Sequence, residues 1–82
     1  MAKQIRFALS AVRDLRRHSS RVKLIKRKID AYALDPASQA NNVKALRGGG
    51  YRLRVGDYRV IFEETEDEIT VTKIGPRGNV YD

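Results

Sequence analysis

The chain has 82 residues, with 17 Lys and Arg against 10 Asp and Glu, which gives a formal net charge of +7 and a pI near 10.1. This length fits one small domain over residues 1–82, and the lack of cysteine excludes disulfides and thiolate chemistry. With no apolar run of about 18 residues and no signal-peptide pattern, the sequence predicts a soluble cytoplasmic protein whose partners are nucleic acid, an acidic protein, or both.

The first elements are predicted to be a strand and a short helix. Residues 3–7 alternate, with Ile5 and Phe7 on one face, as expected of a strand. Ser10 is predicted to be the N-cap of a two-turn amphipathic helix that ends near residues 16–17.

A second helix is predicted from residue 21 to about residue 34. Its apolar residues recur at helical spacing, and the residue before Pro36 is pushed out of the α region, which ends the helix. The two helices are expected to form a hairpin on one face of a sheet. The inward residues of the second helix are Val22, Ile25, Ile29 and Tyr32.

Residues 37–50 are small and polar except for Val43 and Leu46, which we expect to anchor this segment under the sheet. The three glycines at 48–50 permit either a sharp entry into the next strand or a close approach of backbone to a ligand. A Walker-type phosphate loop is disfavoured, because no Lys-Ser/Thr pair follows and no helix begins there.

The centre of the sequence is a predicted β-hairpin over residues 51–63, with the two-residue turn Gly56-Asp57. Tyr51, Leu53 and Val55 point to the same side as Tyr58, Val60 and Phe62. With this turn, Arg54 lies directly opposite Arg59.

Like charges directly opposite each other on a sheet cost about 0.2–1 kcal/mol. The same face also carries Arg52, so three guanidiniums share a small surface in a strongly basic chain. Guanidinium forks onto phosphate oxygens, and we therefore interpret this face as an anion site. The alternative is a solvated basic face whose arginines splay apart.

After an acidic turn at residues 65–68, a last strand is predicted over residues 69–74, with Ile69 and Val71 inward and Thr70 and Thr72 outward. The order strand, helix, helix and three antiparallel strands predicts an α+β fold.

Several kinds of chemistry are disfavoured. His18 is the only histidine and no thiol exists, so no metal site and no cofactor are predicted. The carboxylates Glu66, Asp67 and Glu68 are interpreted as a solvated turn. His18 has no acidic partner in sequence for a nucleophilic triad and is interpreted as a surface residue.

Arginine and tyrosine remain as functional candidates. Arg77 and Tyr81 follow the last strand and are expected near Arg59, on a patch suited to RNA, where arginines hold phosphates and a tyrosine ring stacks on a base. Such a patch is also competent for metal-free RNA cleavage, in which the ribose 2′-hydroxyl attacks the adjacent phosphate. Arginine is a poor general base, which leaves proton transfer to Tyr81, the substrate or water. Tyr81 is equally compatible with simply packing the tail on the sheet.

The run of residues 43–48, the hairpin over 51–62, and the segments Ile74-Gly75-Pro76-Arg77 and Val80-Tyr81 closely resemble toxins of the RelE/ParE superfamily of bacterial type II toxin–antitoxin systems. The resemblance covers nearly the whole chain. It implies a microbial-RNase-like α+β fold and a metal-independent, ribosome-dependent mRNA endonuclease, neutralised by an acidic antitoxin that is partly disordered before binding.

The resemblance also assigns roles to residues. Arg54, Arg59, Arg77 and Tyr81 are the expected catalytic residues, with Arg59 and Arg77 on the scissile phosphate. Six further basic residues are expected to bind either mRNA or ribosomal RNA: Arg52, Lys23, Lys26, Arg27, Lys44 and Arg47.

The sequence departs from many relatives at Pro76 and Gly78, where a histidine and a second arginine are common, and its first-strand lysines are replaced by Arg52 and Arg54. We expect slower cleavage or a greater dependence on the ribosome. Two alternatives remain: a ParE-like inhibitor of DNA gyrase on the same fold, and a non-enzymatic antitoxin-binding module.

Overall fold

A computed structural model describes residues 3–78 of the chain. Its strands form one five-stranded sheet in the order β1-β5-β4-β3-β2, in which only the β1–β5 pair is parallel. The predicted α+β class is confirmed. The elements are β1 (Gln4–Phe7), α1 (Leu9–Arg17), η1 (Ser19–Arg21), α2 (Val22–Leu34), η2 (Pro36–Asn42), β2 (Val43–Ala45), β3 (Tyr51–Val55), β4 (Tyr58–Glu64) and β5 (Glu68–Pro76), where η marks a 3₁₀ helix.

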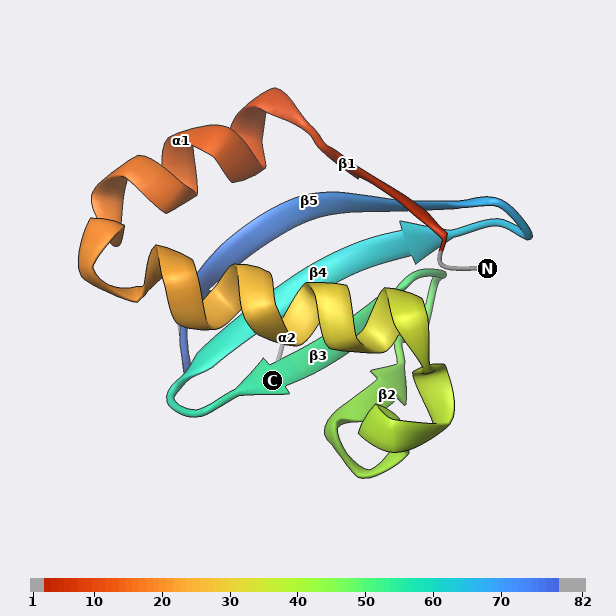
Figure 1. Cartoon of the computed structure of the whole chain (residues 1–82). Helices are drawn as coiled ribbons and strands as arrows, with labels where there is room; N and C mark the ends of the chain where they lie inside the picture. Colours follow the sequence, from red (N-terminus) through yellow and green to blue (C-terminus); the bar gives the residue numbers. More distant parts are fainter. Residues whose placement is uncertain (1–2, 79–82) are drawn as a thin grey trace.

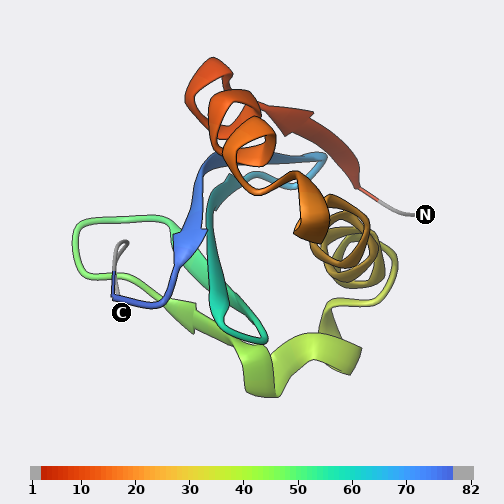
Figure 2. The same cartoon turned by 90° about the vertical axis from the view of Figure 1, so that its left-hand side faces the viewer.

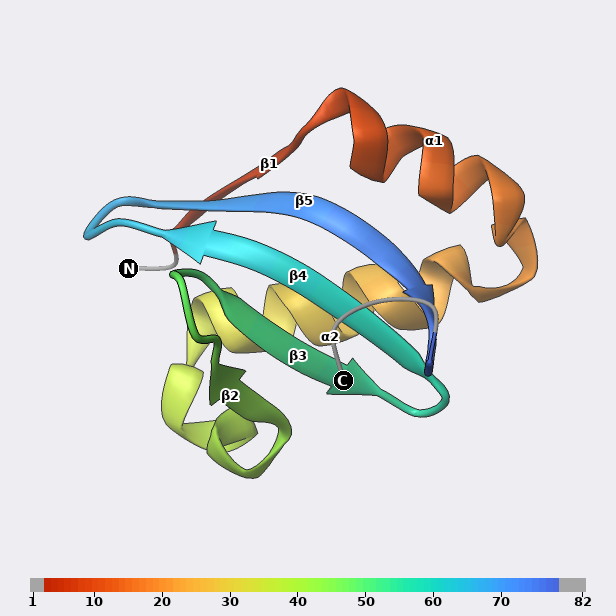
Figure 3. The same ribbon diagram turned by 180° about the vertical axis from the view of Figure 1, so that it is seen from behind.

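The helices and the sheet form two layers. Helices α1 and α2 lie on one side of the curved sheet, as predicted (Figure 1 and Figure 2). Seen from behind, β3, β4 and β5 lie in front of α2, and neither α1 nor α2 covers this second side (Figure 3). We call it the open face. Neither helix is both long and apolar enough to cross a bilayer, within residues 3–78.

The core lies between α2 and the inner face of the sheet. The apolar side of α2 buries Ile25 and Ile29, and Val22 packs against the same cluster. This confirms the helical spacing read from the sequence. From the sheet, the fully buried side chains are Leu53, Val55, Val60, Phe62, Ile69, Val71 and Ile74.

The central hairpin has the predicted register. Val55 pairs with Tyr58, Leu53 with Val60, and Arg54 with Arg59. Gly56 has a φ of 58°, and no described residue other than glycine has a positive φ, so only the first turn position is left-handed. This is the pattern of a type II′ turn, whose twist matches that of the flanking strands.

Three local predictions were wrong or incomplete. Ser10 is not the N-cap of α1. The N-cap is Ala8, two residues earlier, and the Ser10 hydroxyl donates to the carbonyl of Thr72 at 2.6 Å. The predicted order of strand, helix, helix and three strands omitted η2 and the edge strand β2, which lie between residues 36 and 45. A three-residue strand is too short to show an alternating pattern.

The third incomplete prediction concerns β5, which contains a bulge that was not predicted. The register shifts between Ile61 and Phe62, which pair with Lys73 and Val71. Thr72 is therefore the additional residue of a β-bulge. Because of the bulge, Ile74 returns to the inner face and is 2% exposed.

A polar network ties the N-terminal strand to α2 and β4. The Tyr32 hydroxyl donates to Glu64 Oε1 at 2.7 Å, and Lys3 Nζ lies 2.7 Å from Glu64 Oε2. Lys3 Nζ also donates to the Thr65 carbonyl at 2.6 Å. Burial, and then the hydrogen bond to Glu64, raise the pKa of Tyr32 well above its ordinary value of 10.0.

Candidate functional site

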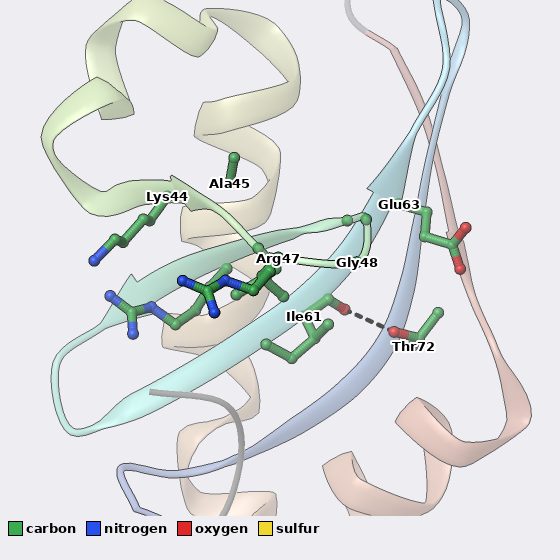
Figure 4. A pocket seen from close by; sticks show the side chains of 11 residues that line it. Lys44, Ala45, Arg47, Gly48, Ile61, Glu63 and Thr72 are labelled. Carbon is green, nitrogen blue, oxygen red and sulfur yellow. Dashed lines mark hydrogen bonds between the residues drawn. The ribbon is translucent and has the colours of Figure 1, made fainter.

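The open face carries a groove of about 840 Å³, which we call the open-face groove. Residues 44–50, from β2 and the β2–β3 connection, form one wall, and side chains of β3, β4 and β5 form the rest (Figure 4). Three basic residues predicted to bind RNA line it: Lys44, Arg47 and Arg52. Sheet pairing places Lys44 opposite Arg52, and Arg52 opposite Ile61.

The wall is shaped by its glycines. Gly48, Gly49 and Gly50 all have positive φ values, between 82° and 109°. The Leu46 amide donates to the Gly50 carbonyl at 3.0 Å, and the Gly49 amide donates to the Leu46 carbonyl at 3.2 Å. These bonds close a tight connection into β3, which agrees with the sharp entry that the triple glycine allows.

The two opposed arginines lie in different environments. Arg54 is exposed, and its Nη2 donates to Asn42 Oδ1 at 3.2 Å, beside a smaller hollow of about 180 Å³ that Arg52 also lines. Arg59 is only 6% exposed, and its Nη1 donates to the carbonyls of Gly56 and Tyr58, each at 3.0 Å. The two guanidiniums therefore point to different surroundings. That of Arg59 is hydrogen-bonded to carbonyls at the hairpin turn, whereas that of Arg54 faces solvent.

Arg77 lies beside the same turn. Its backbone amide donates to the Asp57 carbonyl at 2.7 Å, and its side chain is exposed. Because Arg59 binds Gly56 and Arg77 binds Asp57, both arginines are attached to the two-residue turn of the hairpin. The sequence-based expectation that the exit of β5 lies near Arg59 agrees with this arrangement.

The remaining predicted site residues lie elsewhere. Lys23, Lys26 and Arg27 are exposed on α2, which lies on the other side of the sheet from the open-face groove. Lys26 Nζ lies 5.8 Å from the centroid of the Phe7 ring. Tyr81 lies outside the described residues.

The groove also contains residues that the sequence analysis did not assign to a site. Glu63, Ile61 and Thr72 line it together with the basic residues. Glu63 and Ile61 follow Arg59 at a spacing of two, so the alternation of β4 predicts them on the same face. The alternation of the last strand predicted that Thr72 points outward, and its position in the groove agrees with that prediction.

The described residues offer two chemistries at this surface. Guanidinium and ammonium groups can hold anions, and one carboxylate can accept hydrogen bonds. Within residues 3–78, no cluster of three or more His, Cys, Asp or Glu side chains is arranged to hold a metal ion.

Comparison with solved structures shows the fold. The toxin–antitoxin complex RelBE2 from Mycobacterium tuberculosis contains a chain that superposes with a TM-score of 0.75 at 19% identity, covering 94% of this chain and 100% of that one. The archaeal RelE–RelB complex from Pyrococcus horikoshii OT3 gives a TM-score of 0.73 at 23% identity, covering 98% and 100%.

Sequence comparison shows the family. No curated protein matches the chain. The model of a family described as the ParE toxin of the type II toxin–antitoxin system parDE matches residues 5–81. This match covers most of the chain and confirms the resemblance to the RelE/ParE superfamily. The chain therefore belongs to the ParE toxin family of type II toxin–antitoxin systems, within the RelE/ParE superfamily.

Proposed function

We propose that this toxin is a metal-independent, ribosome-dependent mRNA endonuclease that binds RNA on the open face of its sheet. One observation carries the proposal: the open-face groove is lined by Lys44, Arg47 and Arg52, with the exposed Arg54 beside it. Cations clustered on an accessible sheet face suit a phosphate backbone.

The reaction would be an internal transfer at the phosphate. The ribose 2′-hydroxyl loses its proton and attacks the adjacent phosphorus, the bond to the 5′-oxygen breaks, and that oxygen gains a proton. Guanidiniums stabilise the negative charge that builds on the phosphorus oxygens. Tyr81, or water, would exchange the protons, because arginine does not readily lose its own.

The arginines would divide the work according to their environments. Arg77 is exposed beside the hairpin turn and would contact the scissile phosphate directly. Arg59 would hold the hairpin turn beside Arg77 in place through its hydrogen bonds to the Gly56 and Tyr58 carbonyls. Arg59 itself would contact only a phosphate that lies directly against the turn. Arg52 and Arg54 would position the RNA or assist the departing 5′-oxygen.

Two macromolecular partners follow from this proposal. The ribosome would present the mRNA, and Lys23, Lys26 and Arg27 on α2 would contact ribosomal RNA on the side away from the groove. An acidic antitoxin would bind and neutralise this basic chain of net charge +7. Both similar solved structures are toxin–antitoxin complexes, which supports the second partner.

Inhibition of DNA gyrase is the second candidate function. The matching family model is that of the ParE toxin, and the resemblance of this chain to ParE-type toxins implies gyrase as a target. The burial of Arg59 also favours this candidate, because a residue that is 6% exposed offers little surface to a phosphate.

Purified ribosomes programmed with a defined mRNA test the proposal. The wild-type chain should cut the mRNA, and Arg54→Ala and Arg77→Ala should each lower the cleavage rate at least tenfold. Arg13→Ala is the matched control, because Arg13 is an exposed arginine of α1 outside the proposed contacts. Intact mRNA with the wild-type chain, together with loss of gyrase supercoiling activity, would replace the nuclease by the second candidate.

A further inference from the structure

Among the described residues that line the open-face groove, one carries a carboxylate, Glu63. Glu63 lies on β4, two positions after Ile61, and its side chain is exposed. Within residues 3–78, no ion pair or hydrogen bond engages this carboxylate, unlike those of Glu64 and Glu68. Its acceptor oxygens are therefore available to a ligand.

The two ends of the groove differ in charge. Lys44 and Arg47 lie at one end, whereas Glu63 and Thr72 lie at the other (Figure 4). A carboxylate repels phosphate, so the end that contains Glu63 is unsuited to the nucleic-acid backbone. A ligand that carries a phosphate at one end and hydrogen-bond donors at the other would match both ends.

The groove also contains an apolar residue, Ile61, between its basic end and its acidic end (Figure 4). Ile61 is 7% exposed on this face. A side chain at position 50 would narrow the space, because a Cβ there would lie 3.2 Å from the Phe62 carbonyl and 4.0 Å from Glu63 Cγ. Glycine at this position keeps the backbone wall close to β4 without filling the groove.

We propose that Glu63 is a specificity-determining residue that reads the base of the RNA nucleotide bound in the open-face groove. This inference rests on the proposed function, because it requires RNA on the open face. The phosphate would lie at the end with Lys44 and Arg47, and the base would lie over Ile61 with its edge toward Glu63.

The chemistry of a carboxylate predicts the direction of the preference. An ionised carboxylate only accepts hydrogen bonds, so it pairs with the exocyclic amino groups of cytosine, adenine and guanine. Uracil has no exocyclic amino group, and its single edge donor, N3–H, lies between two carbonyl oxygens that repel a carboxylate. For a well-placed contact of this kind, the expected preference against uracil is roughly 5- to 150-fold.

Equilibrium binding of short 2′-O-methyl oligonucleotides tests the inference without cleavage, because the attacking hydroxyl is blocked. The full chain should bind tri-cytidine and tri-adenosine about tenfold or more tightly than tri-uridine. In Glu63→Gln the amide can donate as well as accept, so this ratio should fall to within about twofold. The matched control is Glu66→Gln, which removes an equal charge from an exposed position outside the groove and should retain the wild-type ratio.

The outcomes separate this inference from the proposed function. Equal binding of all three oligonucleotides by the wild-type chain, or a preference that survives in Glu63→Gln, would overturn the role of Glu63 even if ribosomal mRNA is cut. If the chain neither binds the oligonucleotides nor cuts ribosomal mRNA, the proposed function and this inference both fail.

Discussion

The hydrogen bond between Tyr32 and Glu64 gives a stability prediction that the structure allows to be quantified. Tyr32 is 7% exposed, and the side chain of Glu64 is 13% exposed. Tyr32→Phe removes one donor from a poorly solvated carboxylate while Lys3 remains on its other oxygen. A hydrogen bond to a charged group contributes about 1.5–3 kcal/mol. We expect Tyr32→Phe to lower the free energy of unfolding by about 2 kcal/mol, and Tm by roughly 8–16 °C in a domain of this size.

The matched control is Tyr51→Phe. The Tyr51 ring stacks on Phe62 with ring centroids 5.5 Å apart, and within residues 3–78 its hydroxyl makes no hydrogen bond with a side chain or backbone group. Removing this hydroxyl should change the free energy of unfolding by less than about 0.5 kcal/mol. Urea denaturation followed by circular dichroism measures both variants.

The same comparison has a predicted pH dependence. The pKa of Tyr32 is raised in the folded chain, so at high pH the unfolded chain loses this proton first, and ionisation favours unfolding. The contribution of Tyr32 to the free energy of unfolding is fully present below about pH 10 and is lost as the pH rises above 10. Between pH 7 and 11 the advantage of wild type over Tyr32→Phe should shrink by up to about 1.4 kcal/mol. An advantage below 0.5 kcal/mol at pH 7, or one that stays constant up to pH 11, would refute this reasoning.

Three further stability predictions use the same denaturation assay. Gly50→Ala should cost about 1 kcal/mol more than Gly49→Ala, because both positions have positive φ but only a Cβ at 50 would meet a backbone carbonyl; equal losses would contradict this. Phe62→Ala should cost about 3–5 kcal/mol, because its ring is fully buried, and a loss below 1 kcal/mol would be inconsistent with that burial. Asp14→Ala should cost about 1–3 kcal/mol, because Asp14 Oδ2 accepts a hydrogen bond from the Ile74 amide at 2.8 Å. Asp14→Asn keeps an acceptor oxygen and should lose less stability. Equal losses in the two variants would argue against the hydrogen bond.

The fold was predictable where the sequence has a strong local pattern. The hairpin register follows from alternation around Gly56-Asp57, and α2 follows from its apolar spacing and from Pro36. The parallel pairing of β1 with β5 joins segments at opposite ends of the chain, and no local pattern encodes it. The bond from Ser10 to Thr72 is similarly non-local, which is why a standard capping residue was assigned the wrong role.

The candidate site was predictable in composition more than in arrangement. Alternation placed Arg52, Arg54 and Arg59 on one face of the hairpin, but it could not show that Arg59 folds back onto the turn carbonyls. The basic residues of α2 have the same charge as those of the groove, yet the sheet separates the two groups. The role proposed for Glu63 required the groove itself, because in sequence Glu63 is one of several acidic residues at and around the β4–β5 turn.

Primer extension on mRNA from cells in which the toxin is induced tests the central claim most directly. The nuclease account predicts in-frame cleavages in translated mRNA with the wild-type chain, and their loss in Arg77→Ala. Loss in Tyr81→Phe as well would give the phenol a chemical role. Growth arrest with intact mRNA and DNA damage would contradict the nuclease account and support inhibition of gyrase.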